Sequence, residues 1–151
     1  MDVPIADLEP AQLRPLEREE YEALVCRGFF TDERIELLGG LLVAREPQSA
    51  WHADVIDRLS AHFVEKLGRR ARVRIEKPLA VVADSEPEPD LALVPPRDYR
   101  TAHPSAAWLV VEVAETSMTP DERIKAAVYV LGRGGRVLGG RSPQPHGPRV
   151  P

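Results

Sequence analysis

The segment Trp108–Ala114, with the sequence WLVVEVA, constrains the fold of this chain more than any other. It is almost entirely apolar and lacks the alternation of a strand that has one face in water, so it predicts a central strand covered on both faces. Glu112 is its one charged residue. Because burying an ionised carboxylate without a partner is costly, we expect Glu112 to be paired, protonated or bound to a metal. The alternative is a glutamate at the strand end that reaches solvent or an arginine.

The segments before this strand predict a mixture of helices and strands. Residues 16–25 form a short helical pattern, and two β-rich arms flank Gly39-Gly40, a pair that suits a two-residue hairpin turn. From Trp51 to Gly68 apolar residues recur every four positions, which predicts one amphipathic helix with Ser49 as its N-cap.

The second half of the chain continues the same alternation. Residues 71–82 alternate in polarity, which predicts a strand with one face in water. We expect its apolar residues to share one side; these are Val73, Ile75 and Leu79. Residues 84–89 predict a turn, and Asp90–Val94 a short strand. The residues 119–122 have the pattern of a helix start, with Thr119 as N-cap, Pro120 in the first position and Glu122 closing a capping box.

Length and composition limit the class of protein. A chain of 151 residues is long enough for one α/β domain with a hydrophobic core and too short for two. The single cysteine, Cys26, excludes an internal disulfide and fits a reducing cytoplasm. The N-terminal segment lacks the pattern of a signal peptide, and apolar runs such as Trp108–Val111 are too short to span a bilayer. We therefore expect a soluble cytoplasmic protein with no membrane partner.

The charge is unevenly distributed. The formal net charge is −4, but residues 130–151 hold four arginines and no acid, which leaves 16 basic and 24 acidic residues, or −8, in residues 1–129. Nucleic-acid-binding proteins usually present a basic face. The composition therefore argues against tight, non-specific DNA binding, and a bound metal would offset part of the negative charge.

Three charged residues stand where they could form a site. Asp90 begins a strand after the proline-rich turn EPEPD, and Glu112 lies inside the next strand, so two carboxylates can meet on adjacent strands. Such oxygen ligands suit Mg²⁺ or Mn²⁺. Lys125 lies in the second turn of the following helix, whose side chains lean toward its N-terminus, so its ammonium group can point to the carboxylates. Singly, the three could instead be a turn cap, a strand-end glutamate and a solvated helix lysine.

These motifs resemble a known family. The segments EPDLALV, WLVVEVAETS and DERIKAAVY, preceded by RIELLGGLLV and SAWHADVIDRL, are similar to those of the Uma-two family of restriction endonucleases, in the PD-(D/E)xK nuclease superfamily. The resemblance covers roughly residues 15–129. It implies a restriction-endonuclease-like fold, a central mixed β-sheet flanked by helices. It also implies a Mg²⁺- or Mn²⁺-dependent endonuclease that hydrolyses phosphodiester bonds, with DNA as its partner.

The resemblance also assigns roles to the three charged residues. Asp90 matches the motif aspartate and Glu112 the motif glutamate, and together they would hold the metal ion. The usual motif lysine would stand at position 114, where this chain has Ala114. Lys125 matches a lysine displaced onto the following helix and would position the attacking water.

Two further residues match the family. Glu36, in RIELLGG, matches an early glutamate that would bind or orient the outer waters of the metal ion. His52 matches a histidine that opens the long helix. Glu36 can equally be a strand residue that faces water, and His52 an ordinary residue of the first helical turn.

A second function remains open, a non-catalytic binding or assembly module that retains the nuclease fold. The acidic balance, Ala114 and the unusual C-terminal segment favour this module, whereas the joint presence of Asp90, Glu112 and Lys125 favours the nuclease. A Ser-His-Asp hydrolase lacks support, because the chain contains no GxSxG. The sequence leaves a homodimer open.

The C-terminal segment departs from the rest of the chain. Residues 130–151 are rich in Gly, Pro and Arg and contain no acid and no aromatic residue, which predicts a disordered tail. We therefore divide the chain into a leader (1–15), a nuclease-like domain (16–129) and this tail. The family would continue with an aromatic strand resembling Tyr-Trp-Val-Val-Asp, so we expect a domain that is incomplete at its C-terminal end through truncation or a frameshift.

The frameshift can be tested on the coding DNA. If residues 136–141 are encoded by CGG, GTA, CTG, GGT, GGT and CGA followed by A, a shift of one nucleotide reads Gly-Tyr-Trp-Val-Val-Glu, close to the missing strand. We expect sequencing of the gene to find these codons. Other codons at Val137 or Leu138 would contradict the hypothesis.

Overall fold

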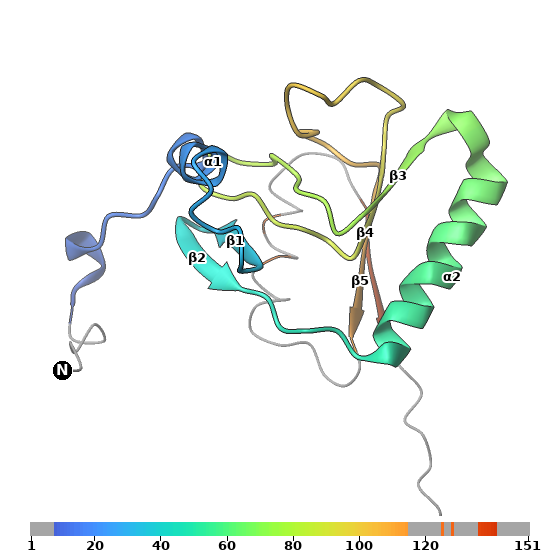
Figure 1. Cartoon of the computed structure of the whole chain (residues 1–151), viewed down its shortest axis with the longest axis horizontal. Coiled ribbons are helices and arrows are strands. Elements are labelled where there is room, and N and C mark those ends of the chain that lie inside the picture. The colour runs from blue at the N-terminus through green and yellow to red at the C-terminus, as the bar shows by residue number, and fades with distance from the viewer. Residues whose placement is uncertain (1–7, 115–124, 126–127, 129–135, 142–151) are drawn as a thin grey trace, which may run out of the picture.

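A four-stranded sheet lies at the centre of the computed structural model, which describes residues 8–114, 125, 128 and 136–141 (Figure 1). Its order is β3-β4-β5-β6. Neighbours are antiparallel except for β5 and β6, which run parallel, so the sheet is mixed, as predicted. The strands are β3 (Arg72–Ile75), β4 (Leu91–Val94), β5 (Leu109–Ala114) and β6 (Arg136–Arg141).

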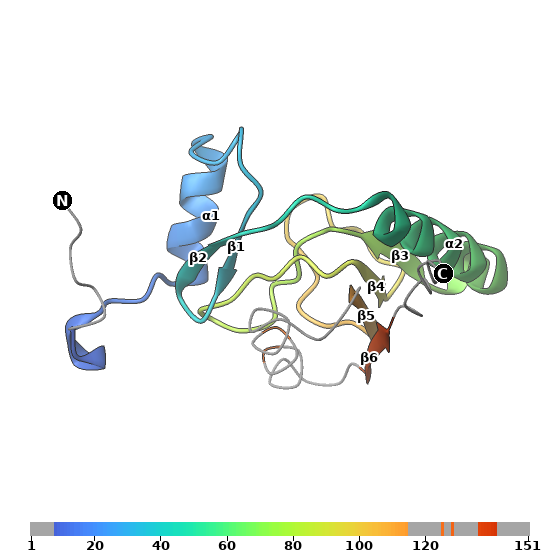
Figure 2. The same ribbon diagram turned by 90° about the horizontal axis from the view of Figure 1, so that it is seen from below.

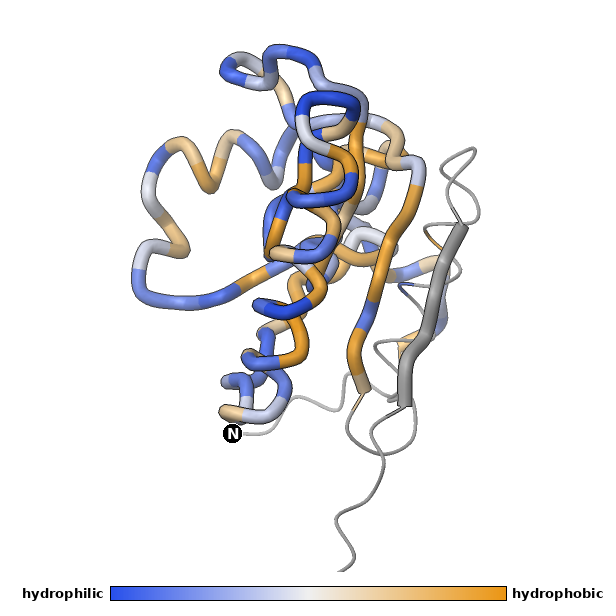
Figure 3. Tube along the Cα trace, turned by 90° about the vertical axis from the view of Figure 1, so that its right-hand side faces the viewer, coloured by the Kyte–Doolittle hydropathy of each residue, from blue (hydrophilic) through white to orange (hydrophobic). Residues whose placement is uncertain are grey.

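Strand β5 occupies the centre that its composition predicts. It pairs with β4 on one side and with β6 on the other, and Figure 3 shows its apolar length interrupted by one hydrophilic position. Its side chains enter two separate cores: Val110 packs in one cluster, and Val111 and Val113 pack in the other. Glu112 is therefore carried into the interior by a strand whose two faces are both covered.

Strand β6 corrects the prediction of a disordered tail. Residues 136–141 pair with β5, with Gly139 opposite Glu112. The outer edge of β5 offers backbone groups that need hydrogen-bond partners, and a strand can supply them whatever its side chains. The prediction is therefore wrong for these six residues. The rest of the segment 130–151 lies outside the described residues, and the proposed domain boundaries stay a prediction.

Helix α2 (Ala50–Leu67) covers one face of the sheet (Figures 1 and 2). The Ser49 hydroxyl accepts a hydrogen bond from the backbone N–H of His52 at 3.1 Å, and the helix ends at Gly68. This confirms the predicted cap and stop. The cluster beneath the helix joins its apolar stripe to β4 and β5; its buried members are Ile56, Leu91, Leu93, Val111 and Val113.

The N-terminal elements form a separate layer beside this sheet. Helix α1 (Arg18–Cys26) lies next to the hairpin of β1 (Ile35–Leu38) and β2 (Leu41–Ala44). The antiparallel pairing of β1 with β2 confirms the predicted turn. The turn glycines Gly39 and Gly40 have φ of +56° and +77°, a conformation that side chains disfavour. A Cβ on Gly40 would also lie 2.1 Å from the Cβ of Pro15, so glycine is required there.

The strand predicted over residues 71–82 is shorter in the structure. It ends at Ile75, because Glu76 has φ of +47° and its N–H donates to the carbonyls of Pro89 and Asp90. Leu79 consequently packs with Ala92 and Val94, in the cluster opposite the one that Val73 contacts. The prediction that Leu79 and Val73 share one side is therefore wrong. The predicted helix start at residues 119–122 lies outside the described residues, although Lys125 and Val128 are helical.

None of the helices in the described ranges is long and apolar enough to cross a membrane.

Glu86 is a buried acid in the loop that precedes β4, next to Glu22 of α1. Its side chain is 4% exposed, and a bridge from Leu37 to Glu86 ties this loop to the hairpin. Burial, together with the neighbouring carboxyl group of Glu22, raises the pKa of Glu86 from 4.5 to about 8. The folded protein therefore retains a proton on Glu86 at pH values where the unfolded chain has lost it.

This arrangement predicts a pH dependence of stability. Because the pKa of Glu86 is raised on folding, the free energy of unfolding should fall as pH rises from about 4.5 to about 8. Glu86→Gln removes the ionisation, so that component of the fall should disappear. Urea unfolding at pH 5 and pH 8.5 measures it, with Glu65→Gln on an exposed position of α2 as the control. Equal losses in the natural chain and in Glu86→Gln would contradict the assignment.

Candidate active site

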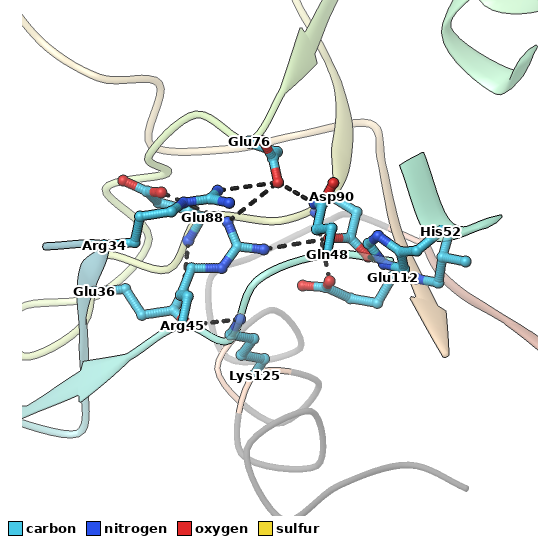
Figure 4. A network of polar contacts seen from close by, with 11 residues as sticks. Arg34, Glu36, Arg45, Gln48, His52, Glu76, Glu88, Asp90, Glu112 and Lys125 are labelled. Carbon is cyan, nitrogen blue, oxygen red and sulfur yellow. Dashed lines mark hydrogen bonds and ion pairs between the residues drawn. The ribbon is translucent and has the colours of Figure 1, made fainter. Parts of the chain in front are cut away.

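Asp90 stands at the entrance of β4 and is almost fully buried, at 3% exposure. Its Oδ2 accepts a hydrogen bond from the backbone N–H of Val113 at 2.7 Å and lies 3.1 Å from Nε2 of His52. Its Oδ1 lies 3.2 Å from Nη2 of Arg45. Since an ionised carboxylate can only accept, the geometry assigns the His52 proton to Nε2. Figure 4 shows these groups converging on Asp90.

Glu112 lies beside Asp90, as the two-strand argument predicts. The antiparallel register pairs Leu91 with Val111, so the residue before Leu91 meets the residue after Val111. The backbone N–H of Asp90 is 3.4 Å from Oε2 of Glu112, which is 9% exposed. Sheet pairing alone therefore brings the two carboxylates together.

Lys125 and Glu36 form a buried ion pair. Nζ of Lys125 lies 2.5 Å from Oε1 of Glu36, while Oε2 of Glu36 accepts from the backbone N–H of Glu88 at 2.9 Å. Both side chains are buried, at 4% and 0% exposure. Lys125 is thus no solvated helix lysine, and Glu36 does not face water.

The ammonium group of Lys125 is held in its charged form. Burial by itself lowers the pKa of Lys125, but the attraction of Glu112 and Glu36 outweighs burial, and the pKa is raised. Lys125 therefore brings a fixed positive charge close to Glu112, the residue that lies beside Asp90.

Arg45 is the component that sequence reasoning missed. It follows β2, its side chain is 9% exposed, and Nη1 lies 3.6 Å from Glu88 and 3.9 Å from Glu76. Arg34, across the hairpin, lies 3.0 Å from Glu76. The sequence offered only a general signal: EPEPD places acids at every second position, which indicates a need for cations from another segment but does not single out Arg45.

Glu88 belongs to the same network. Burial raises the pKa of Glu88, Arg45 opposes this increase, and Glu36 adds to it, with a net rise. Gln48 also donates a hydrogen bond to Glu76 from the segment before α2. The hairpin, the loop before β4 and the start of α2 are therefore connected through one set of polar contacts (Figure 4).

The donor set fits a water-rich divalent cation. An aspartate offers roughly four lone-pair directions. Two on Oδ2 and one on Oδ1 are used, which leaves one direction at Oδ1 of Asp90. Mg²⁺ commonly binds through one or two carboxylates and keeps several waters. Among the described residues no three His, Cys, Asp or Glu side chains form a closed metal cage.

Comparisons with known proteins agree with this architecture. The model of the Uma2 family, described as "Putative restriction endonuclease", matches residues 18–136. A crystal structure from Anabaena variabilis, titled a "putative nuclease belonging to DUF820", matches with a TM-score of 0.62 and 16% identity. The match covers 83% of this chain and 74% of that one, and at this identity it shows a shared fold. No curated protein matches.

The buried pair predicts a large mutational effect. Lys125→Met leaves Glu36 buried without its cation, so the free energy of unfolding should fall by about 3–5 kcal/mol. Urea unfolding measures this change. In the control Arg58→Met, which breaks an exposed pair with Asp54 on α2, the change should stay within about 1 kcal/mol. Similar losses in the two variants would mean that the buried pair contributes no more to the free energy of unfolding than an exposed pair.

Proposed function

Since the chain belongs to the Uma2 family, we propose that it is a metal-dependent nuclease that hydrolyses phosphodiester bonds of DNA with Mg²⁺ or Mn²⁺. The observation that carries the proposal is the convergence of Asp90 and Glu112 from adjacent strands, with the charged Lys125 nearby. Two carboxylates and a lysine provide metal ligands and a cation for the phosphate. Cytoplasmic location and DNA as the substrate are parts of this proposal.

Each residue has a role that its contacts support. Asp90 and Glu112 would hold the ion, which when bound polarises a phosphoryl oxygen and lowers the pKa of a bound water. Lys125 would orient the attacking water and stabilise charge on the phosphate. His52 and the backbone of Val113 fix the orientation of Asp90.

Glu36 receives a different role from the one expected from the sequence. Its two oxygens are engaged by Lys125 and by the backbone of Glu88. We therefore assign it the positioning of Lys125, in place of the outer waters of the metal ion.

One observation favours the alternative, a non-catalytic module with the nuclease fold. Asp90 already contacts three groups, and one of them is the cation of Arg45. In such a module these contacts would complete a structural network, and the site would need no ion.

Nicking of supercoiled plasmid by the full chain with Mn²⁺ or Mg²⁺ tests the proposal. Asp90→Asn should reduce nicking by more than the 10- to 100-fold that loss of an outer-shell partner costs. Asp98→Asn, the same change at an exposed carboxylate paired with Arg100, is the matched control and should retain full nicking. Circular dichroism verifies that each variant is folded.

The other outcomes separate the two functions. Metal-independent nicking, or nicking that survives in Asp90→Asn, would exclude this site as its source. A folded natural chain that does not nick DNA with either ion would favour the non-catalytic module.

A further inference from the structure

Arg45 joins the two halves of the candidate site. On one side its guanidinium contacts Oδ1 of Asp90, and on the other it approaches Glu88 and Glu76. In Figure 4 it lies between the pair Asp90–Glu112 and the pair Glu36–Lys125. A long side chain from the end of a hairpin therefore ends inside the site and is almost entirely buried.

The charges of the network do not balance. Five carboxylates surround three cations, so the formal charge is −2, the opposite of one divalent ion. Removing the guanidinium would leave −3. The carboxylates are Glu36, Glu76, Glu88, Asp90 and Glu112, and the cations are Arg34, Arg45 and Lys125.

The guanidinium is a permanent charge. Burial by itself lowers the pKa of Arg45, but attraction from the surrounding carboxylates outweighs burial, and the pKa is raised. The carboxylates that act on it are Glu36, Asp90, Glu112 and Glu76. The Asp90 oxygen that still has a free lone-pair direction therefore has a permanent positive charge beside it.

We propose that Arg45 is the built-in counter-ion of the metal centre. It compensates the charge of Asp90 when no metal is bound, and its positive charge opposes the binding of a divalent cation by Asp90 and Glu112. This inference rests on the proposed function only in that these two carboxylates are the metal ligands. An ion held by Asp90 would be repelled by the guanidinium that contacts the same carboxylate, and a buried site screens this repulsion less than the surface does.

Charge competition and a merely structural ion pair predict opposite changes in metal affinity. If Arg45 only holds Asp90 in place, its removal disorders the ligand and weakens metal binding. If its charge competes with the ion, its removal strengthens binding. The sign of the change therefore decides between them.

Calorimetric titration of the full chain with Mn²⁺ alone measures this sign. Arg45→Gln should bind Mn²⁺ at least tenfold more tightly than the natural chain, which corresponds to about 1.4 kcal/mol. Arg45→Lys keeps the charge and should stay within threefold of the natural chain. Arg58→Gln, the control, removes an exposed cation that pairs with Asp54 on α2 outside this network, and it should also stay within threefold.

Thermal unfolding provides a second reading. Without metal, Arg45→Gln should melt below the natural chain, and saturating Mn²⁺ should raise its melting temperature by more than it raises that of the natural chain. If Arg45→Gln folds only when Mn²⁺ is present, the same conclusion holds. Failure to fold even with Mn²⁺ would overturn the proposal.

Further results would also overturn it. These are unchanged or weaker Mn²⁺ binding by Arg45→Gln, and equal changes in Arg45→Lys and Arg45→Gln. If such results accompany metal-dependent nicking that Asp90→Asn abolishes, the nuclease stands and the counter-ion role fails. If the natural chain does not nick DNA but Arg45→Gln binds Mn²⁺ more tightly, the counter-ion role stands and the nuclease fails.

Discussion

The burial of several carboxylates in one place is the constraint on which the rest of this structure depends. Glu36, Asp90 and Glu112 are each at most 9% exposed. An uncompensated charge in such surroundings would consume much of the net stability of a domain this size. The fold therefore has to deliver cations and backbone N–H groups to these oxygens, and the elements that supply them are held together as a consequence.

The small hairpin contributes two residues to this network of buried charges. It belongs to a separate two-stranded sheet, yet it supplies both Glu36 and the segment that carries Arg45. The tight turn at Gly39-Gly40 sets the register of the hairpin and lets it pack against Pro15. The hairpin is tied to the loop before β4 by polar contacts such as that of Glu36 with the backbone of Glu88, and it also buries Leu37 and Leu38. The sheet and α2 are joined by an apolar core.

The residues of the site differ in how far the sequence could reveal them. Asp90 and Glu112 were predictable because each breaks an apolar or proline-rich pattern next to a strand, where a charge needs an explanation. Lys125 stood out only together with them, since an isolated helix lysine is usually solvated. Arg45 was not predictable in its role, because an arginine after a strand is ordinary and its partners lie more than 30 residues away in the sequence.

The sequence by itself determined the local elements: the glycine hairpin, the capped helix α2 and the buried strand β5 follow from turn chemistry, periodicity and apolar content. Only the tertiary structure decided that β3 ends at Ile75, before Glu76, that residues 136–141 add a strand, and that Arg45 contacts Asp90. The physical reason is that these outcomes depend on backbone groups and charges offered by distant segments. Local patterns record the conformational preference of a segment, but a free strand edge or an uncompensated carboxylate exists only once the chain has folded.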